Sequence, residues 1–149
     1  MIEKGKPVMD VLSNAQYPVV CLTQRGMRIR DDHSSLVTTT KAGLKNGMFD
    51  RLVVVDCKGN KFQIDSARKI RGVGLFWGYD LFLSQKIKVE LLGVESGSIT
   101  LEDLKGEIHR RFRAWGGWET RDDLGDLKLR IDHAKDFLDL IMVLKSARI

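Results

Sequence analysis

The sequence has no long hydrophobic segment and few cysteines, and both features limit the classes of protein to which it can belong. No apolar run approaches the ~20 residues that a helix needs to cross a bilayer. The N-terminal stretch MIEKGKPVMDVLSN lacks the apolar core of a secretory signal peptide. The two cysteines, Cys21 and Cys57, have no CxxC spacing, and such sparse usage suits a reducing compartment. We therefore expect a cytoplasmic protein without a membrane partner.

The sequence also lacks any set of residues with the spacing of a catalytic, cofactor or metal site. The glycines of residues 72–78 spell GxGxxxG and not the dinucleotide fingerprint, and no convincing helix follows them. The acidic and histidine residues at 31–33 and 132–133 have no second cluster at ligand spacing. Cys57 lies in a predicted turn, where no helix N-terminus lowers its thiol pKa. We expect no cofactor and no metal, and an enzyme of unknown type ranks third among the functions considered.

The composition is that of an ordinary globular chain. Its 149 residues are 43% hydrophobic and 30% charged, which predicts one domain spanning residues 1–149. The net charge is +5, and most of the excess of Lys and Arg lies in residues 1–64. Because this excess is spread over the β-rich part and not gathered into a tail, it is only a mild indication of a nucleic-acid partner.

The clearest pattern is a hairpin over residues 51–65. Residues 52–55, LVVV, form a continuous apolar run that predicts a strand buried on both faces. Gly59 allows the reversal, and Phe62 and Ile64 then alternate with polar residues. A strand that is buried on both faces must lie centrally, with another layer packed over it.

Further strands and helices follow from the same patterns. Strands are predicted at 17–22, 27–30, 36–39 and 86–91, and Thr40 can cap a short helix over 41–46. After Thr100, apolar residues recur at spacings of 3 and 4 and predict a helix that ends at Gly116-Gly117. A last helix is predicted from Thr120. Its apolar stripe consists of Leu124, Leu127, Ile131, Ala134, Leu138 and Ile141.

These elements predict an α+β fold, because no βαβ alternation is present. We expect a strongly curved antiparallel sheet of about five or six strands, with a partial barrel as one form, packed against two C-terminal helices. Residues 1–98 would be mainly β with short helices, and residues 99–149 would form the two-helix cover. The sheet residues expected to face those helices are Val53, Val55, Phe62, Ile64, Val89 and Leu91.

Two sets of residues are candidates for binding. Phe76, Trp77 and Tyr79 lie in a glycine-rich stretch, where they either pack into the core or remain exposed as anchors for a partner protein. The second set is basic and lies at the outward positions of three predicted strands, where it would form a patch for phosphates or an acidic protein if those strands are neighbours. It consists of Arg28, Arg30, Lys61, Lys86 and Lys88.

The leading hypothesis is a non-catalytic domain that binds another protein. Small bacterial inhibitor and immunity proteins share this general form, an analogy of size and class only. The alternative is a nucleic-acid-binding domain that uses a basic sheet face.

Overall fold

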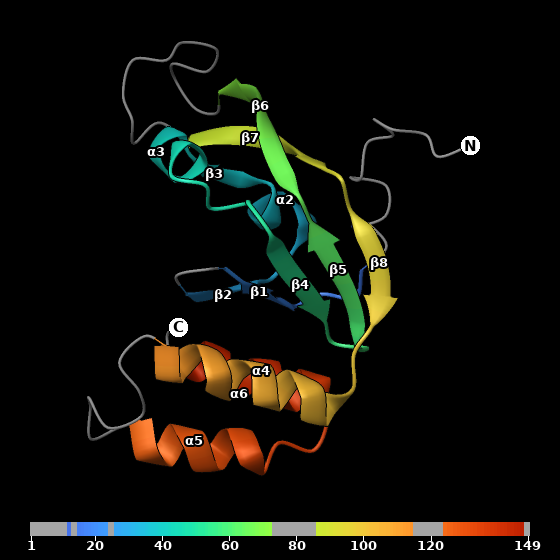
Figure 1. Ribbon diagram of the computed structural model, residues 1–149, viewed down its shortest axis with the longest axis vertical. Coiled ribbons are helices and arrows are strands. Elements are labelled where there is room, and N and C mark those ends of the chain that lie inside the picture. Colours follow the sequence, from blue (N-terminus) through green and yellow to red (C-terminus); the bar gives the residue numbers. More distant parts are fainter. Residues whose placement is uncertain (1–11, 13–14, 24–25, 73–85, 115–123, 148–149) are drawn as a thin grey trace.

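The computed structural model describes residues 12, 15–23, 26–72, 86–114 and 124–147, which form eight antiparallel strands in two sheets and five helices (Figure 1). The predicted α+β class, with antiparallel strands packed against C-terminal helices, is confirmed. The sheets do not close into a barrel. None of the described helices combines the length and the apolar character needed to cross a bilayer.

The larger sheet has five strands in the order β2–β1–β4–β5–β8. Its strands are β1 (Val19–Leu22), β2 (Met27–Arg30), β4 (Leu52–Asp56), β5 (Asn60–Ile64) and β8 (Glu95–Ser98). The predicted hairpin is therefore formed by β4 and β5, and β4 occupies the central position that its apolar run indicates.

The smaller sheet has three strands in the order β3–β7–β6. Its strands are β3 (Thr38–Thr40), β6 (Ser66–Gly72) and β7 (Lys86–Leu92). The chain passes between the two sheets four times. Two of these passages are short bends, at Asp65 between β5 and β6 and at Gly93 between β7 and β8. Gly93 has φ +66°, and a Cβ there would lie 2.7 Å from Cβ of Asp65. The close contact of the two bends therefore requires glycine.

Each face of β4 contributes to a different hydrophobic core. Leu52 and Val54 pack between the two sheets, whereas Val55, with the half-buried Val53 against it, packs on the helices. Of the six residues expected to face the helices, only these two valines do so. The other four pack between the sheets, because a second sheet covers that face. They are Phe62, Ile64, Val89 and Leu91.

Five helices are present in the described part of the chain. They are α2 (His33–Leu36), α3 (Lys41–Lys45), α4 (Leu101–Ala114), α5 (Leu124–Asp132) and α6 (Phe137–Ser146). The last three lie together on one side of β1 and β2, and the three-stranded sheet lies on the other side (Figure 1). The start predicted for α4 is confirmed, since the Thr100 hydroxyl accepts a hydrogen bond from the Asp103 amide at 3.1 Å.

The prediction of one last helix is wrong, because two helices, α5 and α6, replace it. Asp136 begins α6 as its N-cap, and its carboxylate accepts a hydrogen bond from the Asp139 amide at 2.7 Å. The break rotates α6 relative to the predicted stripe, so Leu138 is 46% exposed. The buried face of α6 consists instead of Leu140, Ile141 and Leu144.

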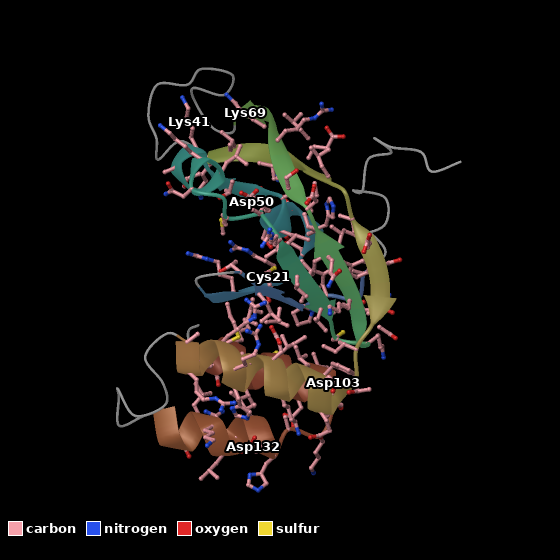
Figure 2. All side chains as sticks on the ribbon, in the orientation of Figure 1. Cys21, Lys41, Asp50, Lys69, Asp103 and Asp132 are labelled. Atoms are coloured by element: carbon pink, nitrogen blue, oxygen red, sulfur yellow. The ribbon has the colours of Figure 1, made fainter. Side chains whose placement is uncertain are left out.

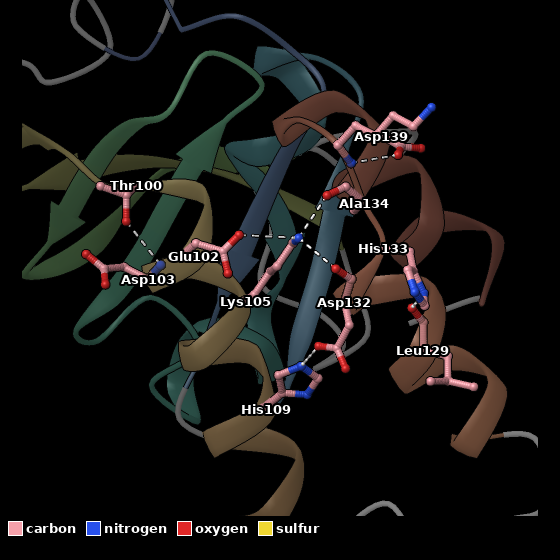
Figure 3. A network of polar contacts seen from close by, with 11 residues as sticks. Thr100, Glu102, Asp103, Lys105, His109, Leu129, Asp132, His133, Ala134 and Asp139 are labelled. Atoms are coloured by element: carbon pink, nitrogen blue, oxygen red, sulfur yellow. Dashed lines mark hydrogen bonds and ion pairs between the residues drawn. The ribbon is translucent and has the colours of Figure 1, made fainter.

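Lys105 of α4 holds this break in place (Figure 3). Its side chain is buried, and its ammonium group donates to the carbonyl oxygens of Asp132 at 3.0 Å and Ala134 at 2.8 Å. The Asp132 carbonyl is at the C-terminal end of α5, where helical hydrogen bonds are missing, and the Ala134 carbonyl is in the short segment between α5 and α6. His109, one turn further along α4, bonds the Asp132 carboxylate at 2.7 Å.

The strand predicted at 36–39 is partly wrong. Residues 33–36 form the one-turn helix α2, and the strand starts at Thr38. A capping box explains the helix, because the Asp32 carboxylate accepts from the Ser35 amide at 2.7 Å while Ser35 Oγ accepts from the Asp32 amide at 3.4 Å. The short helix capped by Thr40 is confirmed as α3, and the Thr40 hydroxyl accepts from the Gly43 amide at 3.0 Å.

Candidate functional site

A basic groove of about 630 Å³ lies between β2 of the large sheet and the segment α2–β3–α3. We call it the basic groove. Side chains with nitrogen atoms occupy the space between β2 and α3 (Figure 2). Most residues that line the basic groove are arginine, lysine, serine or threonine. The lining residues are Arg28, Arg30, Asp32, Ser34, Ser35, Thr38, Thr39, Thr40, Gly43, Met48 and Lys86.

The two arginines form the floor of the basic groove because of the register of β1 and β2. Arg28 is paired with Cys21 and Arg30 with Val19, and directly opposed residues lie on the same sheet face. Val19 and Cys21 are buried in the core between the sheets. The side chains of Arg28 and Arg30 therefore lie on the same sheet face as Val19 and Cys21, one strand further out. The core ends there, and the groove begins.

The opposite wall is built on β3, an edge strand of the small sheet. Thr40 is paired with Lys86 across β3 and β7, so the threonine hydroxyl and the lysine ammonium lie on one face. Because the Thr40 hydroxyl accepts its hydrogen bond from Gly43, its own proton is left to be donated. The wall thus offers both a cation and a hydroxyl donor.

Three of the groove's cations have no acidic partner among the described residues. The side chains of Arg28, Arg30 and Lys86 take part in none of the ion pairs or hydrogen bonds formed there. Lys88 differs, because its ammonium group donates to the Ser34 hydroxyl at 2.7 Å and to the Ser34 carbonyl at 3.2 Å. It attaches β7 to α2 and so has a structural role.

Asp32, which lines the groove, and His33, the residue that follows it, are both titratable. Hydrogen bonds from the Ser35 backbone and side chain hold the pKa of Asp32 below its usual value, so this carboxylate stays ionised. Burial lowers the pKa of His33, and the Lys88 charge lowers it further. At neutral pH His33 is therefore uncharged, and the positive charge of the groove comes from its arginines and lysine.

The structure separates the basic residues that the sequence analysis grouped together. Arg28, Arg30 and Lys86 line the basic groove, and Lys88 contacts Ser34 of its lining. Their strands are not neighbours in one sheet, since β2 and β7 belong to different sheets. Lys61 lines a different depression, which lies beside α4 and has Arg110 and Arg111 in its lining. The guanidinium groups of both those arginines pair with Glu107.

The hydroxyl residues of the groove were not identified as candidates from the sequence. The stretch from Ser34 to Thr40 contains five serines and threonines and follows the basic strand β2. That local richness in hydroxyl groups is the signal that could have identified them. The aromatic candidates Phe76, Trp77 and Tyr79 lie outside the described residues.

The other candidate chemistry is accounted for by structural contacts. Burial raises the pKa of Cys21 to about 12, so its thiol stays protonated. Cys57 is half-buried, with its Sγ 3.7 Å from the carbonyl oxygen of Tyr17. Both cysteines are unbridged. Within the described segments, no three His, Cys, Asp or Glu residues are grouped closely enough to hold a metal ion.

Neither the known protein-family models, nor the curated proteins, nor the solved structures contain a match to this chain.

Proposed function

We propose that this protein is a non-catalytic module that binds nucleic acid in the basic groove. The observation that carries this proposal is the convergence of Arg28, Arg30 and Lys86, from two different sheets, on one hydroxyl-rich groove without acidic partners among the described residues. Cations that lack internal partners are available to phosphates, and phosphate contacts supply most of the sequence-independent affinity for nucleic acid.

The spacing of the arginines suits a phosphate chain. Arg28 and Arg30 are two residues apart on β2, so their Cα atoms are about 7 Å apart along one face. This separation is comparable with that of successive phosphates in an extended single strand. A guanidinium group can bind two oxygens of one phosphate, which favours one arginine per phosphate.

The wall of the groove complements this row of arginines. Lys86 provides a point charge, and the Thr40 hydroxyl provides a donor on the same face. Serine and threonine hydroxyls commonly contact phosphate oxygens and position a nucleic acid without reading its sequence. A nucleic-acid strand lying in the groove would thus meet guanidinium groups on the β2 side, and an ammonium group and a hydroxyl on the β3 side.

The test measures binding of a fluorescein-labelled single-stranded oligonucleotide by fluorescence anisotropy at several salt concentrations. The triple variant Arg28→Gln, Arg30→Gln, Lys86→Gln should lose more than tenfold in affinity. The slope of log K against log salt should also become shallower by about 2, because each lost phosphate contact removes about 0.7. Lys88 is left intact because its ammonium group holds α2.

The matched control makes the same change of charge elsewhere. Lys61→Gln, Arg113→Gln and Lys128→Gln remove three cations that lie on β5, α4 and α5. The proposal requires the control to keep both the affinity and the salt slope of the unmodified protein. No measurable binding by the unmodified protein, or an equal loss in the two triple variants, would contradict it.

The proposal includes a cytoplasmic location, which the two unbridged cysteines support. Binding of a partner protein through Phe76, Trp77 and Tyr79 stays a separate prediction.

A further inference from the structure

A smaller pocket of about 280 Å³ continues the basic groove at its Arg28 end. The two depressions share Arg28, Gly43 and Met48 in their linings. The smaller one lies between Thr23 and Gly26, next to the ends of β1 and β2, and the C-terminal end of α3. We call it the end pocket, and it is lined by Thr23, Gly26, Arg28, Gly43, Asn46, Gly47 and Met48.

The end pocket differs in chemistry from the groove. Among the described residues, Arg28, at the junction, is the one charged residue of its lining, and three of the seven described lining residues are glycines. Gly26 leaves its Cβ position open, since the nearest described atom there, Thr23 Oγ1, would be 3.9 Å away, so a flat group can approach the backbone closely. The half-buried Met48 adds an adaptable apolar surface. This combination suits a neutral planar ring and not a second phosphate.

Asn46 gives the end pocket a means of recognition. Its backbone amide caps α3 by donating to the carbonyls of Ala42 and Leu44. Its side-chain amide, by contrast, forms no hydrogen bond with any described residue. A carboxamide offers a donor and an acceptor side by side, and this pair matches the N6 and N7 edge of adenine.

Building on the proposed function, we propose that the end pocket binds one base of a single-stranded nucleic acid, with adenine preferred through Asn46. The adjoining phosphate would lie in the basic groove, and Arg28 at the junction would contact both. Such a base and its phosphate match the change of the lining from basic and hydroxyl-rich to glycine-rich within one continuous depression. Binding of a base in the end pocket also requires a single-stranded nucleic acid, because in a duplex the base would be stacked and paired.

The experiment compares three labelled oligonucleotides of equal length, namely oligo(dA), oligo(dT) and an abasic chain with the same phosphates. We expect the unmodified protein to bind oligo(dA) at least about fivefold more tightly than oligo(dT), the lower end of what a paired amide contact discriminates. The abasic chain should bind more weakly than both. Asn46→Ala should remove the preference for oligo(dA) while leaving the affinity for the abasic chain unchanged.

The control variant is Gln63→Ala, which removes an exposed side-chain amide on β5, outside both depressions. It should leave all three affinities unchanged. Equal binding of the three probes by the unmodified protein, or an unchanged dA preference in Asn46→Ala, would overturn the base pocket while leaving phosphate binding intact. If none of the probes binds, the proposed function fails, and the base pocket fails with it.

Discussion

At the scale of single residues, the carboxylate of Asp56 at the end of β4 accepts four hydrogen bonds. This buried carboxylate accepts from the backbone amides of Gln16, Lys58 and Asn60 and from the Asn60 side chain, at 2.9–3.0 Å. These hydrogen bonds therefore stabilise the β4–β5 turn and hold Gln16, in the segment before β1, against that turn. Burial alone would raise the pKa of Asp56, but these hydrogen bonds outweigh it and leave the pKa below its ordinary value.

This lowered pKa predicts a dependence of stability on pH. Because the folded pKa lies below that of the unfolded chain, Asp56 stabilises the fold fully above about pH 4 and progressively less as the pH falls through the folded pKa. Asp56→Asn should lower the free energy of unfolding at pH 7 by about 1–3 kcal/mol, since an amide group replaces one acceptor oxygen. Between about pH 4 and pH 2, its stability should fall less steeply than that of the unmodified protein.

Urea titrations of both proteins across that pH range would check this prediction. Asp50→Asn is the matched control, because Asp50 is exposed. Identical pH profiles for Asp56→Asn and the unmodified protein would show that the Asp56 carboxylate does not titrate with folding.

At the scale of elements, the break between α5 and α6 changes which leucines stabilise the helical layer. Leu140 is fully buried, whereas Leu138 is 46% exposed. Leu140→Ala should therefore lower the free energy of unfolding by about 2–5 kcal/mol, the usual cost of a cavity. Leu138→Ala should cost less than ~1 kcal/mol. Denaturant titration of the two variants makes the comparison. A larger loss of unfolding free energy in Leu138→Ala than in Leu140→Ala would contradict the break and support a single continuous helix.

The elements predicted correctly from the sequence are those in which the local pattern and the burial agree. The β4–β5 hairpin, β7 and α4 have regular apolar periods, and Thr40 and Thr100 cap the helices that their positions indicate. In each of them, the face that the sequence marks as apolar is the face that is buried. The local sequence was sufficient for these elements.

The missed elements have weak or competing local signals. All four residues of β8 are exposed, so this strand has no apolar period to reveal it. The α5–α6 break was hidden because Ala134 and Ile141 continue the spacing of the stripe across it. The capping signal of Asp136 with Asp139 was present in the sequence, and at this position it determined the helix boundary.

The candidate site was less predictable than the fold, because its parts come from separate sheets. Arg28 and Arg30 belong to β2, Lys86 belongs to β7, and Thr40 lies between them in the chain. Their outward positions were predictable from alternation, but their convergence depends on how the two sheets face each other. The same arrangement places Lys61 on another surface.

At the scale of the whole molecule, the five-stranded sheet is the middle layer. The helices cover one face of β1 and β4, and the three-stranded sheet covers the other (Figure 1). The basic groove opens where this second cover ends, between β2 and β3, which are edge strands of different sheets. A ligand in the groove would therefore touch both sheets at once.

This placement predicts where bound nucleic acid slows hydrogen exchange. Edge strands exchange by local opening, which a ligand that contacts them suppresses, whereas distant elements respond only when the whole molecule unfolds. At about 100 times its Kd, a ligand adds about 2.7 kcal/mol to the stability of the state that binds it. We therefore expect oligo(dA) to slow short-time exchange in both β2 and β3, and to leave α5, which packs on α4 and α6, unchanged.

Hydrogen–deuterium exchange with mass spectrometry, on peptides that cover these three elements, gives the measurement. The variant with Arg28, Arg30 and Lys86 replaced by glutamine should show no slowing under the same conditions, because it lacks the phosphate contacts. Slower exchange in only one of the two edge strands would mean that the ligand binds one sheet alone. In that case the groove would not be the site, because an oligonucleotide that fills the groove must contact both Arg28 and Arg30 on β2 and the edge of β3.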